Sequence, residues 1–147
     1  MTGTQQTYPE GVASAVTYCR EVLSGAIAAC RFVALTCARF LNDLEAAEAG
    51  DGSWAFRPEL AERAMLFAGL MPNIKGPEAG RPLRLMPWQR LVSANLFGFV
   101  ERETSARRFR QAVVYVPRGM KHKAVGKLTV LTVCIPRGVL DDIYEVE

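Results

Sequence analysis

Apolar residues recur every three or four positions through the first hundred residues, which is the spacing that places them on one face of a helix. This pattern predicts helices over 9–23, 26–49 and 88–100, and another that starts at Pro58. Pro9, Pro58 and Pro87 stand at three of the predicted starts, and proline suits the first helical turn. Ser24-Gly25 is expected to end the first helix and Gly50-Asp51-Gly52 the second, with Ser24 as the N-cap of the second.

The same period identifies the side chains expected to face the core. On the second helix they are Ile27, Cys30, Ala34, Cys37, Leu41 and Leu44. On the third they are Leu60, Ala64, Phe67 and Met71, and on the fourth Trp88, Leu91 or Val92, Asn95 and Phe99. Residues 71–87 are rich in proline and glycine, so we expect an irregular connector there.

The pattern changes after Arg108. Residues 109–116 are β-branched and aromatic and end at Pro117, and their continuous apolar half predicts a strand covered on both faces, as in a parallel sheet. Residues 128–135 give a second strand signal that ends at Pro136. The predicted fold class is therefore mainly α with a few C-terminal strands. Because two strands alone make a poor sheet, the chain reads as the start of an α/β domain that it does not finish.

Composition places the chain among ordinary globular domains. It has 147 residues, of which 50% are hydrophobic, and a formal net charge of +3. No apolar run approaches the roughly 20 residues that span a bilayer. The polar start, residues 1–8, is expected to be disordered, and it has no apolar core of a secretory signal, so we expect no membrane and a cytoplasmic location.

Cysteine and histidine exclude several kinds of site. The four cysteines, Cys19, Cys30, Cys37 and Cys134, have spacings that match no zinc pattern, and we expect them to be small buried hydrophobes rather than disulfide partners. A single histidine, His122, leaves little material for a metal site or a Ser-His-Asp triad. We therefore assign no metal ligand and no catalytic residue.

Trp88 and Gln89 follow Pro87 in the first turn of the predicted fourth helix. A glutamine amide both accepts and donates, so it can pair with N6 and N7 of adenine while a neighbouring tryptophan packs near the base. The alternative from spacing alone is that Gln89 is a surface helix residue and Trp88 a core anchor.

Residues 102–127 contain eight basic side chains and one acidic side chain, Glu103, while the rest of the chain carries a net charge of −4. A local basic segment in an acidic chain favours contacts with the phosphates of a nucleotide or a nucleic acid. The candidate contacts are Arg107, Arg108, Arg110, Lys121 and Lys123. The alternative is a solvated strand edge and loop.

The order of short motifs resembles the N-terminal part of a phage terminase large subunit, the ATP-driven motor that packages double-stranded DNA. The segments that carry the resemblance are Tyr18–Gly25, Ala29–Arg31, Leu41–Leu44, Trp54–Phe56, Leu85–Gln89, Leu96–Gly98, Arg107–Arg110 and Val116–Arg118. They cover about residues 8–119. The resemblance implies a helical region over 9–104, the first strand of a P-loop ATPase-like core over 105–118, and a divergent tail over 119–147.

The resemblance implies roles for single residues. Gln89 with Trp88 would contact adenine, and Arg118 would reach the nucleotide phosphates, where its fork geometry differs from that of lysine. ATP and Mg²⁺ would be the cofactors of the family, and we expect this chain to bind neither tightly. Double-stranded DNA, the portal and the small terminase subunit would be its partners, in the host cell cytoplasm.

After Arg118 the sequence departs from the family. The glycine, lysine and serine or threonine of the Walker A loop are replaced in register by Lys121, His122 and Lys123, and no acidic Walker B strand or nuclease carboxylate cluster follows. We therefore expect no catalysis by the chain alone and interpret it as a truncated or frameshifted terminase fragment. The alternative is a small stand-alone helical module whose basic edge binds DNA or a partner protein.

Overall fold

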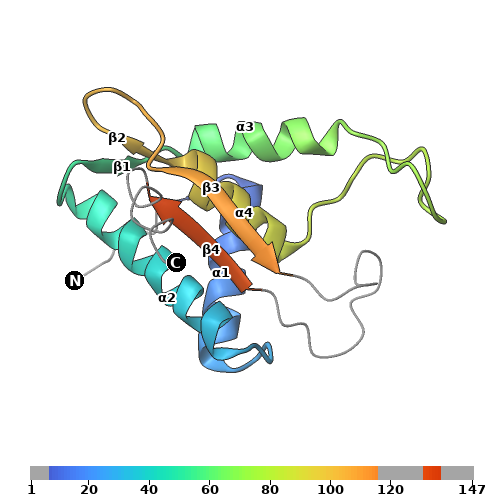
Figure 1. Ribbon diagram of the computed structural model, residues 1–147, viewed down its shortest axis with the longest axis horizontal. Coiled ribbons are helices and arrows are strands. Elements are labelled where there is room, and N and C mark those ends of the chain that lie inside the picture. Colours follow the sequence, from blue (N-terminus) through green and yellow to red (C-terminus); the bar gives the residue numbers. More distant parts are fainter. Residues whose placement is uncertain (1–6, 116–130, 137–147) are drawn as a thin grey trace, which may run out of the picture.

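The computed structural model describes residues 7–115 and 131–136, which are mainly helical with a few short strands (Figure 1). The coarse fold class expected from the sequence is thus confirmed for this part of the chain. The helices are α1 (Glu10–Ser24), α2 (Arg31–Ala49), α3 (Pro58–Gly69) and α4 (Pro87–Gly98). The strands are β1 (Trp54–Phe56), β2 (Phe99–Glu101), β3 (Phe109–Tyr115) and β4 (Leu131–Pro136).

Two glycines end the first two helices as expected. Gly25 and Gly50 both have φ of 82°, a left-handed conformation that glycine adopts without steric cost. The predicted start of α2 and its predicted N-cap, Ser24, were wrong, because α2 begins at Arg31 after an extended Cys30 and Ser24 is the last residue of α1. Residues 25–30 instead turn the chain back so that α2 packs beside α1, and this packing overrides the helix preference of the alanines there.

The buried faces of α2 and α3 differ from the predicted ones. On α2 the buried residues are Val33, Cys37, Phe40 and Leu44. Cys37 and Leu44 were predicted, whereas Ala34 and Leu41 are only half-buried and Val33 and Phe40 take their places. The predicted Ile27 and Cys30 lie before the helix and are half-buried. On α3 the buried residues are Ala61 and Met65, whereas Phe67 is 64% exposed and Met71 lies beyond the helix end. Met65 lies beside Gly11 of α1, which places that face of α3 inward.

The start of α1 is held by a side chain from α3. The Glu62 carboxylate accepts the backbone N–H groups of Gly11 and Val12, at 3.1 and 3.2 Å. These groups have no partner within the first turn of a helix, and a carboxylate there also complements the helix dipole. A Cβ on Gly11 would lie 2.5 Å from Met65 Sδ and 2.7 Å from a Glu62 carboxylate oxygen, so a larger residue here would displace both side chains.

The fourth helix ends earlier than predicted, and its last residues form a strand instead. Phe99 has an extended backbone, and β2 pairs antiparallel with β1, aligning Phe56 with Phe99 and Trp54 with Glu101. Neither short strand was predicted, since three residues are too few to show a period. The connector between α3 and α4 is irregular, as expected.

The strand β3 was predicted correctly at its start, but its environment was not. It pairs antiparallel with β4 rather than lying in a parallel sheet, and Gln111 and Val113 are exposed, so the strand is not covered on both faces. A bulge between Phe109 and Gln111 interrupts the register. Val116 and residues 128–130, at the ends of the two predicted strands, lie outside the described residues.

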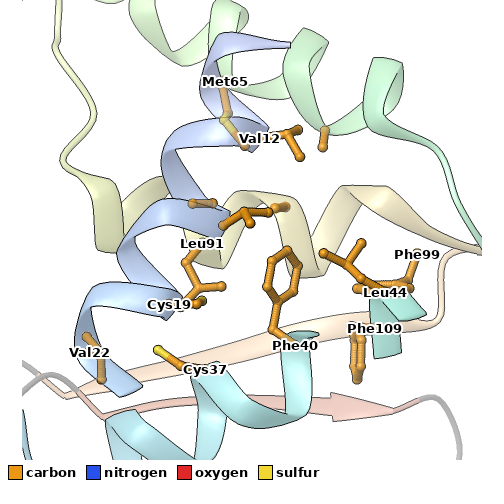
Figure 2. Packing of buried hydrophobic residues seen from close by; sticks show 14 of the residues in the cluster. Val12, Cys19, Val22, Cys37, Phe40, Leu44, Met65, Leu91, Phe99 and Phe109 are labelled. Carbon is orange, nitrogen blue, oxygen red and sulfur yellow. The ribbon is translucent and has the colours of Figure 1, made fainter. Parts of the chain in front are cut away.

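The core lies where the helices meet the start of β3 (Figure 2). Phe40, Phe99 and Phe109 are fully buried, and the rings of Phe40 and Phe109 each contact Phe99 edge to face at about 6 Å. Cys19 and Cys37 face each other beside this cluster, one on α1 and one on α2 (Figure 2). Tyr8, which we expected in a disordered N-terminus, packs edge to face on Phe56; residues 1–6 of that terminus lie outside the described residues.

Candidate nucleotide site and basic edge

Gln89 lies in the first turn of α4 and is half-buried. Its side-chain oxygen accepts the backbone N–H of Met86 at 2.8 Å, so the residue caps the start of its own helix. Within the described residues, its amide nitrogen makes no hydrogen bond. Pairing with adenine needs a donor for N7 and an acceptor for N6, and Gln89 retains the donor and the second lone pair of its oxygen.

Trp88 is half-buried and packs against the core cluster, as the core-anchor alternative describes. Its indole Nε1 is buried and has no hydrogen-bond partner among the residues that the structure describes. A buried N–H without a partner is uncommon in folded proteins and lowers stability by about 1–3 kcal/mol. Trp88 and Gln89 together therefore present two donors that the described part of the protein does not use.

Arg108, one of the predicted phosphate contacts, is held in place by other side chains of the protein. Its guanidinium forms an ion pair with Asp43 on α2, with 3.1 Å between Nη1 and Oδ1. It also lies 4.9 Å from the centroid of the Phe109 ring. These contacts give Arg108 a structural partner on α2 and leave less of its charge available to an external phosphate.

Arg39, on α2, completes this cluster. Its Nη1 binds the other oxygen of Asp43 at 3.2 Å, and its Nη2 donates to Asn95 Oδ1 at 2.9 Å. Asn95 is fully buried on α4 and its own amide donates to the Leu91 carbonyl. The cluster of Arg39, Asp43, Asn95 and Arg108 thus joins α2, α4 and the start of β3.

Arg107 and Arg110 remain exposed on either side of Arg108 and Phe109. Neither has an ion pair within the described residues, and Arg107 lies 5.3 Å from the centroid of the Phe97 ring. Arg102, which belongs to the same basic segment, donates to the carbonyls of Ala47 and Gly52 and so caps the end of α2. Among the residues that the structure describes, the basic edge therefore consists of Arg107 and Arg110.

Three predicted site residues, Arg118, Lys121 and Lys123, lie outside the described residues. The motifs Leu41–Leu44 and Arg107–Arg110 were identified from the sequence, but the ion pair between Asp43 and Arg108 was not predicted. The contacts of Arg39 and Asn95 with this pair were not predicted either. Asp43 lies on neither the predicted apolar face of this helix nor the buried one, so the sequence held no local signal for its role. Asn95 was predicted to face the core, and its burial there required a polar partner.

Cys19 and Cys37 are buried free thiols, and Cys30 is half-buried and also free. The hydrogen bond between Cys19 and Cys37, together with burial, raises the pKa of the Cys19 thiol well above its usual range. A thiol held neutral is a poor nucleophile and a poor metal ligand. Across residues 7–115 and 131–136, no three histidine, cysteine or acidic side chains gather closely enough to hold a metal ion.

Comparison of the chain with protein-family models, curated proteins and solved structures found no match. Among the helices of the described residues, none combines the length and the apolar character needed to cross a membrane.

Proposed function

We propose that this chain corresponds to the N-terminal part of a phage terminase large subunit, the ATP-driven motor that packages double-stranded DNA into procapsids. The observation that supports this proposal is the pairwise contact of motif segments that are distant in sequence. Asp43 of Leu41–Leu44 pairs with Arg108 of Arg107–Arg110, and Phe56 of Trp54–Phe56 packs against Gly98 of Leu96–Gly98. We expect segments that resemble the same family and also contact each other to form one functional unit.

In this proposal, the first turn of α4 provides the adenine side of the nucleotide site. Gln89 would donate from Nε2 to adenine N7 and accept from adenine N6, while its oxygen keeps the Met86 N–H. Capping fixes the side chain before a ligand arrives, so little rotamer freedom is lost on binding. ATP and Mg²⁺ are the implied cofactors, with the portal, the small terminase subunit and double-stranded DNA as implied partners.

The experiment follows the Gln89 side-chain amide and the Trp88 indole N–H by ¹H–¹⁵N NMR while ATP or GTP is added to the full chain. We expect shifts at both groups with ATP and much smaller shifts with GTP, because guanine presents a carbonyl where adenine presents N6. Gln89→Glu keeps the helix cap but removes the donor to N7, and should abolish the difference between ATP and GTP at the Trp88 indole N–H, the group that can still be followed in this variant. Gln111→Glu, which makes the same change on exposed β3, is the matched control.

Equal shifts with ATP and GTP, or no shift at either group, would contradict the adenine role. The alternative function is a stand-alone helical module that binds DNA through its basic edge, which the exposure of Arg107 and Arg110 favours. A neighbouring reading frame that encodes Gly-Lys-Ser/Thr and an acidic Walker B strand would support the terminase proposal over this alternative.

A further inference from the structure

The last two turns of α3 and the following connector carry apolar side chains that point away from the core. Leu66, Phe67, Leu70, Met71 and Ile74 are all exposed, with Leu70 at 80% and Ile74 at 88%. We call residues 66–84 the arm. In Figure 1 the arm extends from the end of α3 beyond the rest of the described protein before it returns to α4.

The outward face of α3 has a regular helical spacing. Arg63, Leu66, Phe67 and Leu70 occupy positions i, i+3, i+4 and i+7, which form one stripe. The opposite face, with Ala61 and Met65, is already buried. A helix that is apolar on two faces normally has both faces covered, and clustered exposed apolar residues mark interaction surfaces.

The connector holds its shape through its own hydrogen bonds. Leu83 N–H donates to the Met71 carbonyl, Asn73 N–H to the Arg81 carbonyl and Gly80 N–H to the Asn73 carbonyl, each at 2.8 Å. The Asn73 side-chain amide also donates to the Arg81 carbonyl at 3.2 Å. Ile74 is therefore presented on a bonded turn, which reduces the entropy lost when a partner binds.

The charges around the arm that have no ion-pair partner among the described residues are all basic. Arg63, Lys75 and Arg84 are exposed and form no ion pair with any described residue, whereas Arg81 is paired with Glu78 at 3.1 Å. Two identical surfaces of this kind would place like charges opposite each other, which disfavours a second copy of the chain. The complementary surface has an apolar groove with carboxylates at its border.

We propose that the arm is the docking surface for a second protein that presents an apolar groove bordered by acidic side chains. The stripe on α3 enters the groove as a helix does in helix-in-groove recognition, with Phe67 and Leu70 as anchors and Ile74 extending the contact. Arg63, Lys75 and Arg84 then face the acidic border, which sets orientation and accelerates encounter.

The test uses a displayed library of a small three-helix protein in which the residues of one groove are randomised. Library members that bind the full chain are selected. We expect selected grooves to carry leucine, isoleucine or phenylalanine bordered by aspartate or glutamate. Purified binders should lose at least about tenfold in affinity for Phe67→Ser, for Ile74→Ser and for Lys75→Glu with Arg84→Glu, in line with the cost of removing an interface anchor. Phe32→Ser is the matched control, because Phe32 is an equally exposed aromatic residue on α2, at 59%.

Because the substituted side chains are exposed, the variants should keep the wild-type circular dichroism spectrum and unfolding midpoint. A selection that yields no binder sensitive to Phe67→Ser, or only grooves bordered by lysine and arginine, would overturn the proposal. So would co-sedimentation with vesicles of phosphatidylcholine and phosphatidylglycerol that Phe67→Ser abolishes, which would assign the arm to a membrane surface. Self-association by sedimentation velocity that Phe67→Ser abolishes would assign it to a second copy.

Discussion

Asp43 on α2 and Arg108 before β3 form an ion pair, with 3.1 Å between the carboxylate oxygen and the guanidinium nitrogen. The second oxygen of Asp43 binds Arg39 at 3.2 Å. One carboxylate therefore bridges two guanidinium groups, and each of these lies 4.9 Å from the centroid of the Phe109 ring. This arrangement attaches the start of β3 to the helices.

Asp43→Asn should lower the free energy of unfolding by about 1–3 kcal/mol, which is the range for hydrogen bonds to charged groups. The amide keeps the size of the side chain but leaves two neighbouring cations without their shared anion. Urea unfolding followed by circular dichroism measures the change. Asp51→Asn, the same substitution at an exposed aspartate, is the control.

A double-mutant cycle with Arg108→Met separates the ion pair from other effects of the substitution. If the two substitutions add with no coupling energy, the pair contributes nothing to the fold and the assignment of Arg108 as structural would fail.

Gly98→Ala should destabilise the protein by about 1–3 kcal/mol through overpacking. A Cβ at this position would lie 2.3 Å from Phe56 Cε2, inside a packed junction of α4 with β1. Phe56→Leu in the same chain should recover part of the loss, since a shorter side chain makes room for the methyl group. Differential scanning calorimetry checks both variants.

Gly69→Ala is the matched control for this substitution. Its Cβ would meet only the Leu83 carbonyl, at an ordinary 3.7 Å, and alanine favours the helix. A Gly98→Ala protein as stable as the Gly69→Ala protein would contradict the close packing of Phe56.

The sequence predicted the helices well because their apolar period, proline starts and glycine ends agree with one another. Pro58 and Pro87 begin α3 and α4, and Gly25 and Gly50 end α1 and α2. The faces of α2 and α3 were harder to predict. Which side of a helix is buried depends on its neighbours, and the contact of Met65 with Gly11 of α1 has no local signal.

The candidate site was less predictable than the fold. Pro87 was enough to predict that Gln89 lies in the first turn of α4. The hydrogen bond by which its oxygen caps the helix depends on the backbone geometry of Met86. The sequence does not distinguish Arg108 from Arg107 and Arg110. Only the position of Asp43 in the fold separates Arg108 from its exposed neighbours. Long-range pairing of this kind cannot be read from one sequence without its fold.

Alkaline pH should destabilise the protein through Tyr18. Burial raises the pKa of Tyr18 to about 12, from an ordinary value of 10.0. Because the folded state favours the protonated phenol, the stabilisation is fully present below pH 10 and declines as the pH rises from about 10 to 12. Urea unfolding at pH 9, 10 and 11 should show a steeper decline in the wild type than in Tyr18→Phe.

Titration of tyrosinate absorbance at 295 nm gives an independent measurement of the same group. The wild type should ionise at higher pH than a tyrosine model compound, and Tyr18→Phe should lack one of the late-titrating groups. Identical pH dependence of stability in the two proteins would show that Tyr18 is not protected by the fold.

The chain alone should not hydrolyse ATP, with or without double-stranded DNA. Its sequence lacks the glycine, lysine and hydroxyl side chain that bind the β- and γ-phosphates and Mg²⁺ in P-loop enzymes. Phosphate release from the purified chain should equal that of buffer. Release above this level that Arg118→Ala abolishes would contradict the prediction and assign a catalytic role to Arg118.

DNA binding by the basic segment should be weak, non-specific and sensitive to salt. If about four to six basic side chains reach phosphates, the logarithm of the association constant falls with the logarithm of salt concentration at a slope of roughly −4 to −5. Arg107 and Arg110 are the exposed described members, whereas Arg108 is paired with Asp43. Replacing Arg107 and Arg110 together with alanine should therefore reduce the slope by roughly 2, measured by fluorescence anisotropy of a labelled duplex.

The matched control replaces Arg20 and Arg31, which are exposed on α1 and α2, and removes the same total charge. It should leave the slope nearly unchanged, because contacts with phosphate depend on where the charge lies and not only on the net charge. Equal losses in the two double variants would mean that the protein binds DNA through its overall charge, and the basic edge would then have no particular role. A reduced slope confined to the Arg107 and Arg110 variant would locate the DNA contact beside the start of β3.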